Sequence, residues 1–235
     1  VSAPDDGHLQ SIRKRFGVSV TTDNRYCAQQ ADIVVLAVKP QVMGDVCRDI
    51  APVVQNTRPL MVSIAAGLTA DTLDTWLGGG LPLVRVMPNT PSLVGKGAAG
   101  LFANSQVKDD QRNAVQKVFE TIGSALLVDD HNLLHSVTAL SGSGPAYFFL
   151  MLEALESAAT EAGIESETAR ALAIQTMAGA AEMAARSEDD PGQLKRNVMS
   201  PGGTPERALN PFEEGGLRDP GKKAYSPPLE PPRRA

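Results

Sequence analysis

Residues 33–40 read Ile-Val-Val-Leu-Ala-Val-Lys-Pro, a short run of aliphatic and β-branched side chains that stops at a proline. Similar runs recur at Leu60–Ala65, Leu83–Met87 and Ala125–Val128, with a weaker one at Gly97–Ala103. Continuous apolar runs of this length are typical of strands that are buried on both faces of a parallel sheet. The first half of the chain is therefore predicted to contain such a sheet.

Helical patterns separate these runs. Their apolar residues recur at helical spacing in Asp6–Phe16, Gln41–Ile50, Thr69–Leu77 and Asp109–Ile122. Alternation of strands and helices predicts an α/β fold with a parallel sheet. We assign residues 1–129 to this Rossmann-type domain.

The second half contains no strand-like run. It contains long patterns rich in Ala, Leu, Met and Glu, which favour helices, at Asn132–Leu140, Pro145–Ala162, Ser166–Arg186 and Pro191–Met199. A further helix is predicted at Glu206–Gly215. Residues 130–217 are thus predicted to be all-helical, and the proline-rich residues 218–235 to be disordered.

Composition excludes several classes of protein. The formal net charge is −5 and no basic run occurs, which argues against a nucleic-acid partner. No apolar stretch is long enough to cross a membrane, and no signal peptide is evident. Cys27 and Cys47 fit two reduced thiols in a cytoplasmic protein, and His8, His131 and His135 match no metal-ligand pattern.

Three consecutive strands end in unusual residues. The segments are AVKP at 37–40, SIAAG at 63–67 and MPNTP at 87–91. Small residues and prolines after a strand allow a flat cofactor to lie close to the backbone. Each could instead be a tight turn between a strand and a helix, but three in a row favour a cofactor-binding edge.

The start of the chain lacks the expected nucleotide fingerprint. A Rossmann unit begins with a strand, GxGxxG and a helix, and no such motif is present. Val1–Asp5 resembles the end of the second strand, so we expect the first strand and glycine turn to be missing. Ser2 at that strand end leaves room for a 2′-phosphate and favours NADP, whereas Asp5 and Asp6 would oppose it.

Two glycine-containing motifs lie in the helical half. In SGSGPAY, residues 141–147, Gly142 and Gly144 are predicted to break a helix that Pro145 restarts. In SPGGT, residues 200–204, a loop leads into a helix N-terminus suited to a carboxylate. The alternatives are a packing kink for the first motif and an ordinary helix connection for the second.

The order AVKP, SIAAG, MPNTP, SGSGPAY, SPGGT resembles the pyrroline-5-carboxylate reductase family. The resemblance implies a Rossmann domain followed by a helical domain that forms a homodimer or a larger homo-oligomer. It implies reduction of the small-molecule substrate 1-pyrroline-5-carboxylate to L-proline with NADPH or NADH.

The resemblance also implies roles for individual residues. The cofactor would contact Ser2, Asn24, Ala37, Val38, Lys39, Pro40, Ala65 and Ala66. The substrate would lie among Glu188, Asn197, Gly202, Gly203 and Thr204. Ser141, Ser143 and Thr204 would be the catalytic residues beside the reacting ring.

Departures from the family pattern keep two other hypotheses open. The family usually has a second Thr after Thr204, where this chain has Pro205, and the sequence becomes unlike the family from Arg218. The chain could therefore be a non-catalytic fragment that retains the helical dimer module. A hydroxy-acid dehydrogenase would need a Lys or His acid–base in the helical half, where Lys195 is the only lysine between Leu140 and Asn210.

Overall fold

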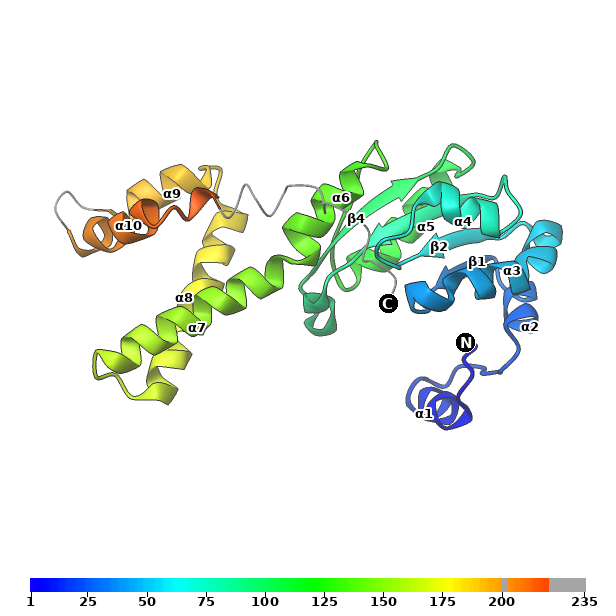
Figure 1. Cartoon of the computed structure of the whole chain (residues 1–235), viewed down its shortest axis with the longest axis horizontal. Coiled ribbons are helices and arrows are strands. Elements are labelled where there is room, and N and C mark those ends of the chain that lie inside the picture. Colours follow the sequence, from blue (N-terminus) through cyan, green and yellow to red (C-terminus); the bar gives the residue numbers. More distant parts are fainter. Residues whose placement is uncertain (200–202, 220–235) are drawn as a thin grey trace. The chain divides into compact units, whose positions relative to one another are not determined.

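The computed structural model describes residues 1–199 and 203–219, apart from the side chains of residues 204–206. The chain forms two compact units, one spanning Val1–Ser143 and the other beginning at Gly144 (Figure 1). Of the residues predicted to be disordered, 218–235, Arg218 and Asp219 are described, whereas 220–235 and the predicted site residue Gly202 lie outside the described residues.

The first unit is built on a five-stranded sheet. Its strands are β1 (Ile33–Leu36), β2 (Leu60–Ser63), β3 (Leu83–Met87), β4 (Gly97–Ala103) and β5 (Gly123–Leu127), in the spatial order β1-β2-β3-β4-β5. Strands β1, β2 and β3 are parallel to one another, as are β4 and β5. The Rossmann-type α/β class is confirmed.

One feature of the predicted sheet is wrong, because β3 and β4 are antiparallel. A parallel pair needs a long crossover, usually a helix on one face of the sheet. The connection here is only the short 3₁₀ helix η1 (Thr90–Val94), which turns the chain straight back. The sheet is therefore mixed, but the three strands followed by the unusual motifs still run the same way.

The helices of this unit have clear local causes. They are α1 (Asp6–Phe16), α2 (Asn24–Gln29), α3 (Pro40–Thr57), α4 (Ala70–Trp76), α5 (Asp109–Glu120) and α6 (Leu133–Val137). Asp5, Asp23 and Thr69 each accept a backbone N–H bond at an N-cap, which supplies a partner for a helix donor. Helix α2 was not predicted, because its only signal in the sequence is the Asp23 cap.

Helix α3 continues beyond its predicted end at Ile50. It passes through Pro52 to Thr57, and Val54 on its last turns is fully buried. Burial of that face outweighs the local penalty of a proline, which is about 3 kcal/mol in a helix interior.

Apolar side chains cover both faces of the sheet, as the continuous runs predicted. One cluster joins α3 and α4 to alternate strand residues such as Met61 and Leu83. The other contains Val62, Val84 and Val115 of α5. Successive residues of β2 and β3 enter opposite clusters, which is the two-residue period of a strand.

The second unit is helical. It contains α7 (Gly144–Glu161), α8 (Ser166–Arg186), α9 (Pro191–Asn197) and α10 (Thr204–Glu214). The predicted helices agree with these bounds to within a few residues. Within the described part of the chain, none of the helices has the length and apolar character required to span a bilayer.

Candidate active site

The three strand-end motifs lie at one edge of the sheet. Because β1, β2 and β3 are adjacent and parallel, AVKP, SIAAG and MPNTP all follow their carboxyl ends. In open α/β sheets ligands bind at this edge. The structure thus brings together segments that are well separated in the sequence.

The residues predicted to contact a cofactor leave the backbone accessible at this edge. Ala37, Lys39, Pro40 and Ala66 are exposed, Val38 is half-buried, and Ala65 is buried. Gly67 has φ +76° and no atom within 4 Å of the position a Cβ would take. A flat group can therefore approach the main chain there without meeting a side chain.

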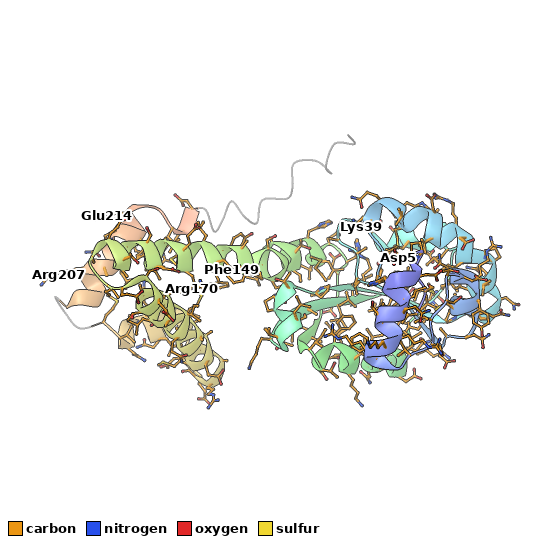
Figure 2. The ribbon with its side chains drawn as sticks, turned by 90° about the horizontal axis from the view of Figure 1, so that it is seen from below. Asp5, Lys39, Phe149, Arg170, Arg207 and Glu214 are labelled. Atoms are coloured by element: carbon orange, nitrogen blue, oxygen red, sulfur yellow. The ribbon has the colours of Figure 1, made fainter. Side chains whose placement is uncertain are left out.

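Lys39 occupies the N-cap position of α3, and Pro40 begins the helix. Figure 2 labels Lys39 at this position. No described side chain caps the first turn of α3, so its amides and the lysine form a positive region. A phosphate group fits this donor set.

The first residues of the chain are held to the segment before α2. Ser2 forms an isolated parallel bridge with Thr21, and the Ala3 N–H donates to the Thr21 carbonyl at 3.3 Å. Asn24 begins α2 and is half-buried. Asp5, expected to oppose a 2′-phosphate, accepts the His8 N–H as the cap of α1, so its carboxylate already has a structural role (Figure 2).

Asn89 of MPNTP, which was not predicted to be a site residue, joins two segments through hydrogen bonds of its side chain. Its Oδ1 accepts the Ala98 N–H at 2.9 Å, and its Nδ2 donates to the Ser141 carbonyl at 2.9 Å. One side chain therefore fixes the start of β4 and the segment containing Ser141. An Asn within a strand-end motif was the available signal, but its partners are 9 and 52 residues away.

The segment around Ser141 differs from the prediction. The helix does not break at Gly142; residues Thr138–Gly142 form a π-helical turn, η2, and Ser143 keeps a right-handed helical conformation. The Ser143 N–H donates to the Thr138 carbonyl at 2.8 Å, so that donor is not free for a ligand. π turns are frequent at functional sites.

The two predicted catalytic serines of this motif differ in their surroundings. The Ser141 hydroxyl donates to the Val137 carbonyl at 3.0 Å and is half-buried, whereas Ser143 is exposed. Because its proton is engaged, the Ser141 oxygen offers only lone pairs to a ligand. Ser141 can therefore accept a hydrogen bond from a protonated nitrogen.

In the second unit, Asn197 is fixed by its neighbours. It accepts from Gln193 Nε2 at 2.7 Å and donates to Asp189 Oδ2 at 3.1 Å. Glu188 is exposed in the adjacent segment. Glu188 thus precedes α9 by three residues, and Asn197 is the last residue of α9.

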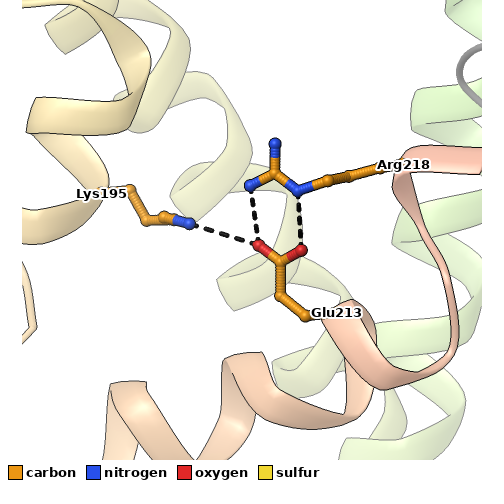
Figure 3. A network of polar contacts seen from close by, with 3 residues as sticks. All are labelled: Lys195, Glu213 and Arg218. Carbon is orange, nitrogen blue, oxygen red and sulfur yellow. Dashed lines mark hydrogen bonds and ion pairs between the residues drawn. The ribbon is translucent and has the colours of Figure 1, made fainter.

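Gly203 is the N-cap of α10, and Thr204 is its first residue. The ends of α9 and α10 are tied together by a charged cluster (Figure 3). Glu213 accepts from Lys195 Nζ at 3.3 Å and from Arg218 at 2.7 and 2.8 Å. Hydrogen bonds from Arg218 and Lys195 lower the pKa of Glu213 to about 2.

Lys195 is therefore paired with a carboxylate, which does not suit a free acid–base catalyst of the hydroxy-acid dehydrogenase type. Among the described residues, no group of three or more His, Cys, Asp or Glu side chains could hold a metal ion.

Family models match both halves of the chain. Residues 131–226 match the family "Pyrroline-5-carboxylate reductase dimerisation", and residues 1–67 match "NADP oxidoreductase coenzyme F420-dependent".

Individual relatives cover nearly the whole chain. A pyrroline-5-carboxylate reductase of Pseudomonas aeruginosa is 44% identical over 92% of this chain and 80% of its own length. One from Pisum sativum is 37% identical over 93% of this chain and 80% of its own length.

Solved structures of pyrroline-5-carboxylate reductases are similar to this chain over most of its length. A pyrroline-5-carboxylate reductase from Coxiella burnetii has a TM-score of 0.91 and 42% identity, covering 96% of this chain and 84% of its own. A pyrroline carboxylate reductase from Plasmodium falciparum with NADP bound has a TM-score of 0.83 and 31% identity, covering 95% and 82%. This chain belongs to the pyrroline-5-carboxylate reductase family.

Proposed function

We propose that this chain reduces 1-pyrroline-5-carboxylate to L-proline with NAD(P)H, the last step of proline biosynthesis. The observation that carries the proposal is the edge where three motif-bearing strands end, tied through Asn89 to the turn that contains Ser141. Pyrroline-5-carboxylate reductases match more than nine tenths of the chain, which favours an enzyme over a fragment that retains only the helical module.

The residues present fit a nicotinamide dinucleotide. When bound, it supplies the hydride. The AVKP turn offers the α3 amides and Lys39 to a phosphate, and the Ala65–Gly67 backbone offers an open surface to a flat ring. The proposed contacts are Ser2, Asn24, Ala37, Val38, Lys39, Pro40, Ala65 and Ala66.

Ser141 is proposed to orient the imine. The C=N carbon accepts hydride more readily when the nitrogen carries a proton, and the Ser141 oxygen can accept a hydrogen bond from that N–H. The hydride joins the carbon, the C=N π pair moves to nitrogen, and the proton remains there as the amine forms. Ser143 and Thr204 are the other two residues proposed, from the family resemblance, to be catalytic. Orientation would then provide most of the acceleration.

The substrate carboxylate is proposed to bind at the start of α10. Gly202, Gly203 and Thr204 precede or begin this 11-residue helix, whose N-terminus favours an anion. Glu188 and the fixed amide of Asn197 complete the proposed substrate site.

We further propose that the protein is a homodimer or larger homo-oligomer. Phe148, Phe149 and Leu150 of α7 are 60%, 65% and 66% exposed. An open groove of about 680 Å³ separates α7 from α8, with Phe149 and Arg170 on its two walls (Figure 2). A helical hairpin with this much exposed apolar surface is expected to be covered by a second copy.

A cytoplasmic location is part of the proposal. It is supported by Cys27 and Cys47, which are unpaired thiols. Burial raises the pKa of Cys47 to about 11, so this thiol stays protonated and unreactive at neutral pH.

The test is oxidation of NADPH and NADH that depends on 1-pyrroline-5-carboxylate, with L-proline measured as the product. Ser141→Ala should lower kcat, and the control Ser124→Ala on β5 should not. Pro205→Thr adds a backbone N–H to the first turn of α10 and should lower KM for the imine. Absence of proline formation by every one of these proteins would refute the proposed function.

A further inference from the structure

The first unit buries a cation without a carboxylate partner. Arg85 lies in the middle of β3, pairs in register with Ser63 of β2, and is only 4% exposed. Within the described residues no Asp or Glu lies at ion-pair distance from it. Arginines this deeply buried are rare unless they are paired, so this one calls for an explanation.

The guanidinium is held by two neutral acceptors. Nη2 donates to the Ala65 carbonyl at 3.2 Å, and Nη1 lies 2.9 Å from His131 Nε2. Within the described structure, Nε has no hydrogen-bond partner. Because a guanidinium can only donate, Nε2 of His131 must be the acceptor, and the imidazole must be neutral with its proton on Nδ1.

His131 contacts the other end of the same turn. The Ala70 N–H, the first amide of α4, donates to His131 Nε2 at 3.3 Å. The imidazole packs edge-on against Phe102 of β4, with ring centroids 5.4 Å apart. Arg85 and His131 thus contact the SIAAG turn at Ala65 and the helix start that follows it at Ala70.

We propose that Arg85 and His131 are positioning residues that hold the Ala65–Gly67 turn against the cofactor, and that they do so only while the imidazole is neutral. The inference rests on the proposed function for the identity of the group at this edge. Ala66 and Gly67 have no large side chains that could fix the turn, so the polar contacts from β3 and the segment before α6 take that role.

The surroundings of the imidazole favour its neutral form. Burial, Arg85 and His135 lower the pKa of His131, whereas Asp71 of α4 and Asp130 act in the opposite direction. Protonation would put a donor against the Arg85 guanidinium and the Ala70 N–H, so both contacts would be lost. The turn should therefore loosen as the pH falls.

Three variants separate this role from a general loss of stability. In His131→Gln the side-chain oxygen can accept in place of Nε2 and does not titrate. In His131→Leu the acceptor is removed. His135→Gln is the control that keeps His131, because no contact of His135 with Arg85 or Ala70 is seen among the described residues. Its ring packs edge-on against His131 and lowers the pKa of that group, so this variant should lose affinity on acidification at least as readily as the unmodified chain.

The first measurement is the NADPH dissociation constant between pH 5.5 and 8. At pH 8 we expect His131→Leu to weaken binding about tenfold, which corresponds to about 1.4 kcal/mol, close to the net contribution of one hydrogen bond. His131→Gln and His135→Gln should stay close to the unmodified chain. At pH 5.5 the NADPH affinity of the unmodified chain and of His135→Gln should fall more than that of His131→Gln. His131→Gln keeps every other titrating group, so its own change in affinity measures what those groups contribute.

The second measurement is backbone amide exchange over residues 64–72 of the cofactor-free protein. Exchange at Ala70 should be faster in His131→Leu and unchanged in His131→Gln. If this pattern and the affinities hold but no proline forms, the proposed function fails and the positioning role stands. Equal affinities and equal exchange in the Gln and Leu variants, or an undiminished pH dependence in His131→Gln, would overturn the inference.

Discussion

The substitution Asn89→Asp tests the hydrogen bond between the MPNTP turn and the segment that contains Ser141. The two side chains have nearly the same shape. In the variant, one carboxylate oxygen can still accept the Ala98 N–H, which is 2.9 Å from Oδ1. The other oxygen takes the place of Nδ2, 2.9 Å from the Ser141 carbonyl, and two acceptors then face each other.

The expected loss follows from that geometry. A hydrogen bond contributes about 1 kcal/mol net, and a buried acceptor without a partner costs a further 1–3 kcal/mol or so. Asn89 is half-buried, so we expect the variant to lose about 2 kcal/mol of unfolding free energy at pH 7. That is a change of about 30-fold in the folding equilibrium.

The effect of Asn89→Asp on the free energy of unfolding should depend on pH. Once protonated, the carboxyl introduced by Asn89→Asp could donate to the Ser141 carbonyl again, so the folded state should raise the pKa of that group. The folded variant then binds more protons than the unfolded chain, and its stability relative to the unmodified chain rises as the pH falls. The difference should therefore shrink between pH 7 and about pH 4.

Urea unfolding at one protein concentration, at both pH values, measures this difference. The rate of imine-dependent NADPH oxidation at pH 7 should fall as well, because the carbonyl and hydroxyl of Ser141 belong to the same turn. Equal unfolding free energies at pH 7, or a difference that grows on acidification, would refute the reasoning.

Three other variants probe separate parts of the structure. Gly100→Ala would place a Cβ 2.7 Å from Val137 Cγ1, and thermal unfolding should show a loss of about 1–3 kcal/mol; an unchanged midpoint would contradict the packing. Phe149→Lys on α7 should dissociate the oligomer in sedimentation velocity, whereas Lys117→Glu on α5 should not. Glu213→Gln removes the charge that joins Lys195 and Arg218, and should raise KM for the imine without changing the NADPH dissociation constant. In the unmodified chain, whose Glu213 has a lowered pKa of about 2, the cluster should persist above pH 4.5 and weaken as the pH falls from there; loss of its contribution already at pH 6 would contradict this assignment.

Local patterns were enough to predict most helices and strands. Helices α1 and α8 have the bounds predicted for them, Asp6–Phe16 and Ser166–Arg186, and a side chain caps the N-terminus of each. The direction of β4 was not predictable in the same way. It depends on whether the residues after MPNTP form a crossover helix or a single 3₁₀ turn, and short segments carry little periodicity.

The site could be predicted only in part. The motifs at 37–40, 63–67 and 87–91 are contiguous in sequence, and a parallel sheet brings their ends together by construction. The contacts of Arg85 with His131 and of Asn89 with Ser141 join residues 46 and 52 positions apart. The charged residue inside the apolar run LVRVM was visible, but its partner was not, since partner choice depends on how β3 packs against the segment before α6.

At this edge of the sheet, the residues proposed to touch the cofactor differ from those that hold the backbone in place. Of the eight residues proposed to touch the cofactor, four are Ala or Pro, which offer main-chain atoms and do not fix their own positions. Two polar side chains, Arg85 of β3 and His131 of the segment before α6, contact the backbone of this edge at Ala65 and at Ala70. Substitutions at the tying residues should therefore change ligand affinity at a distance. A small-for-small exchange at Ala66 should change it little, because the backbone path of this turn is set by the contacts at Ala65 and Ala70.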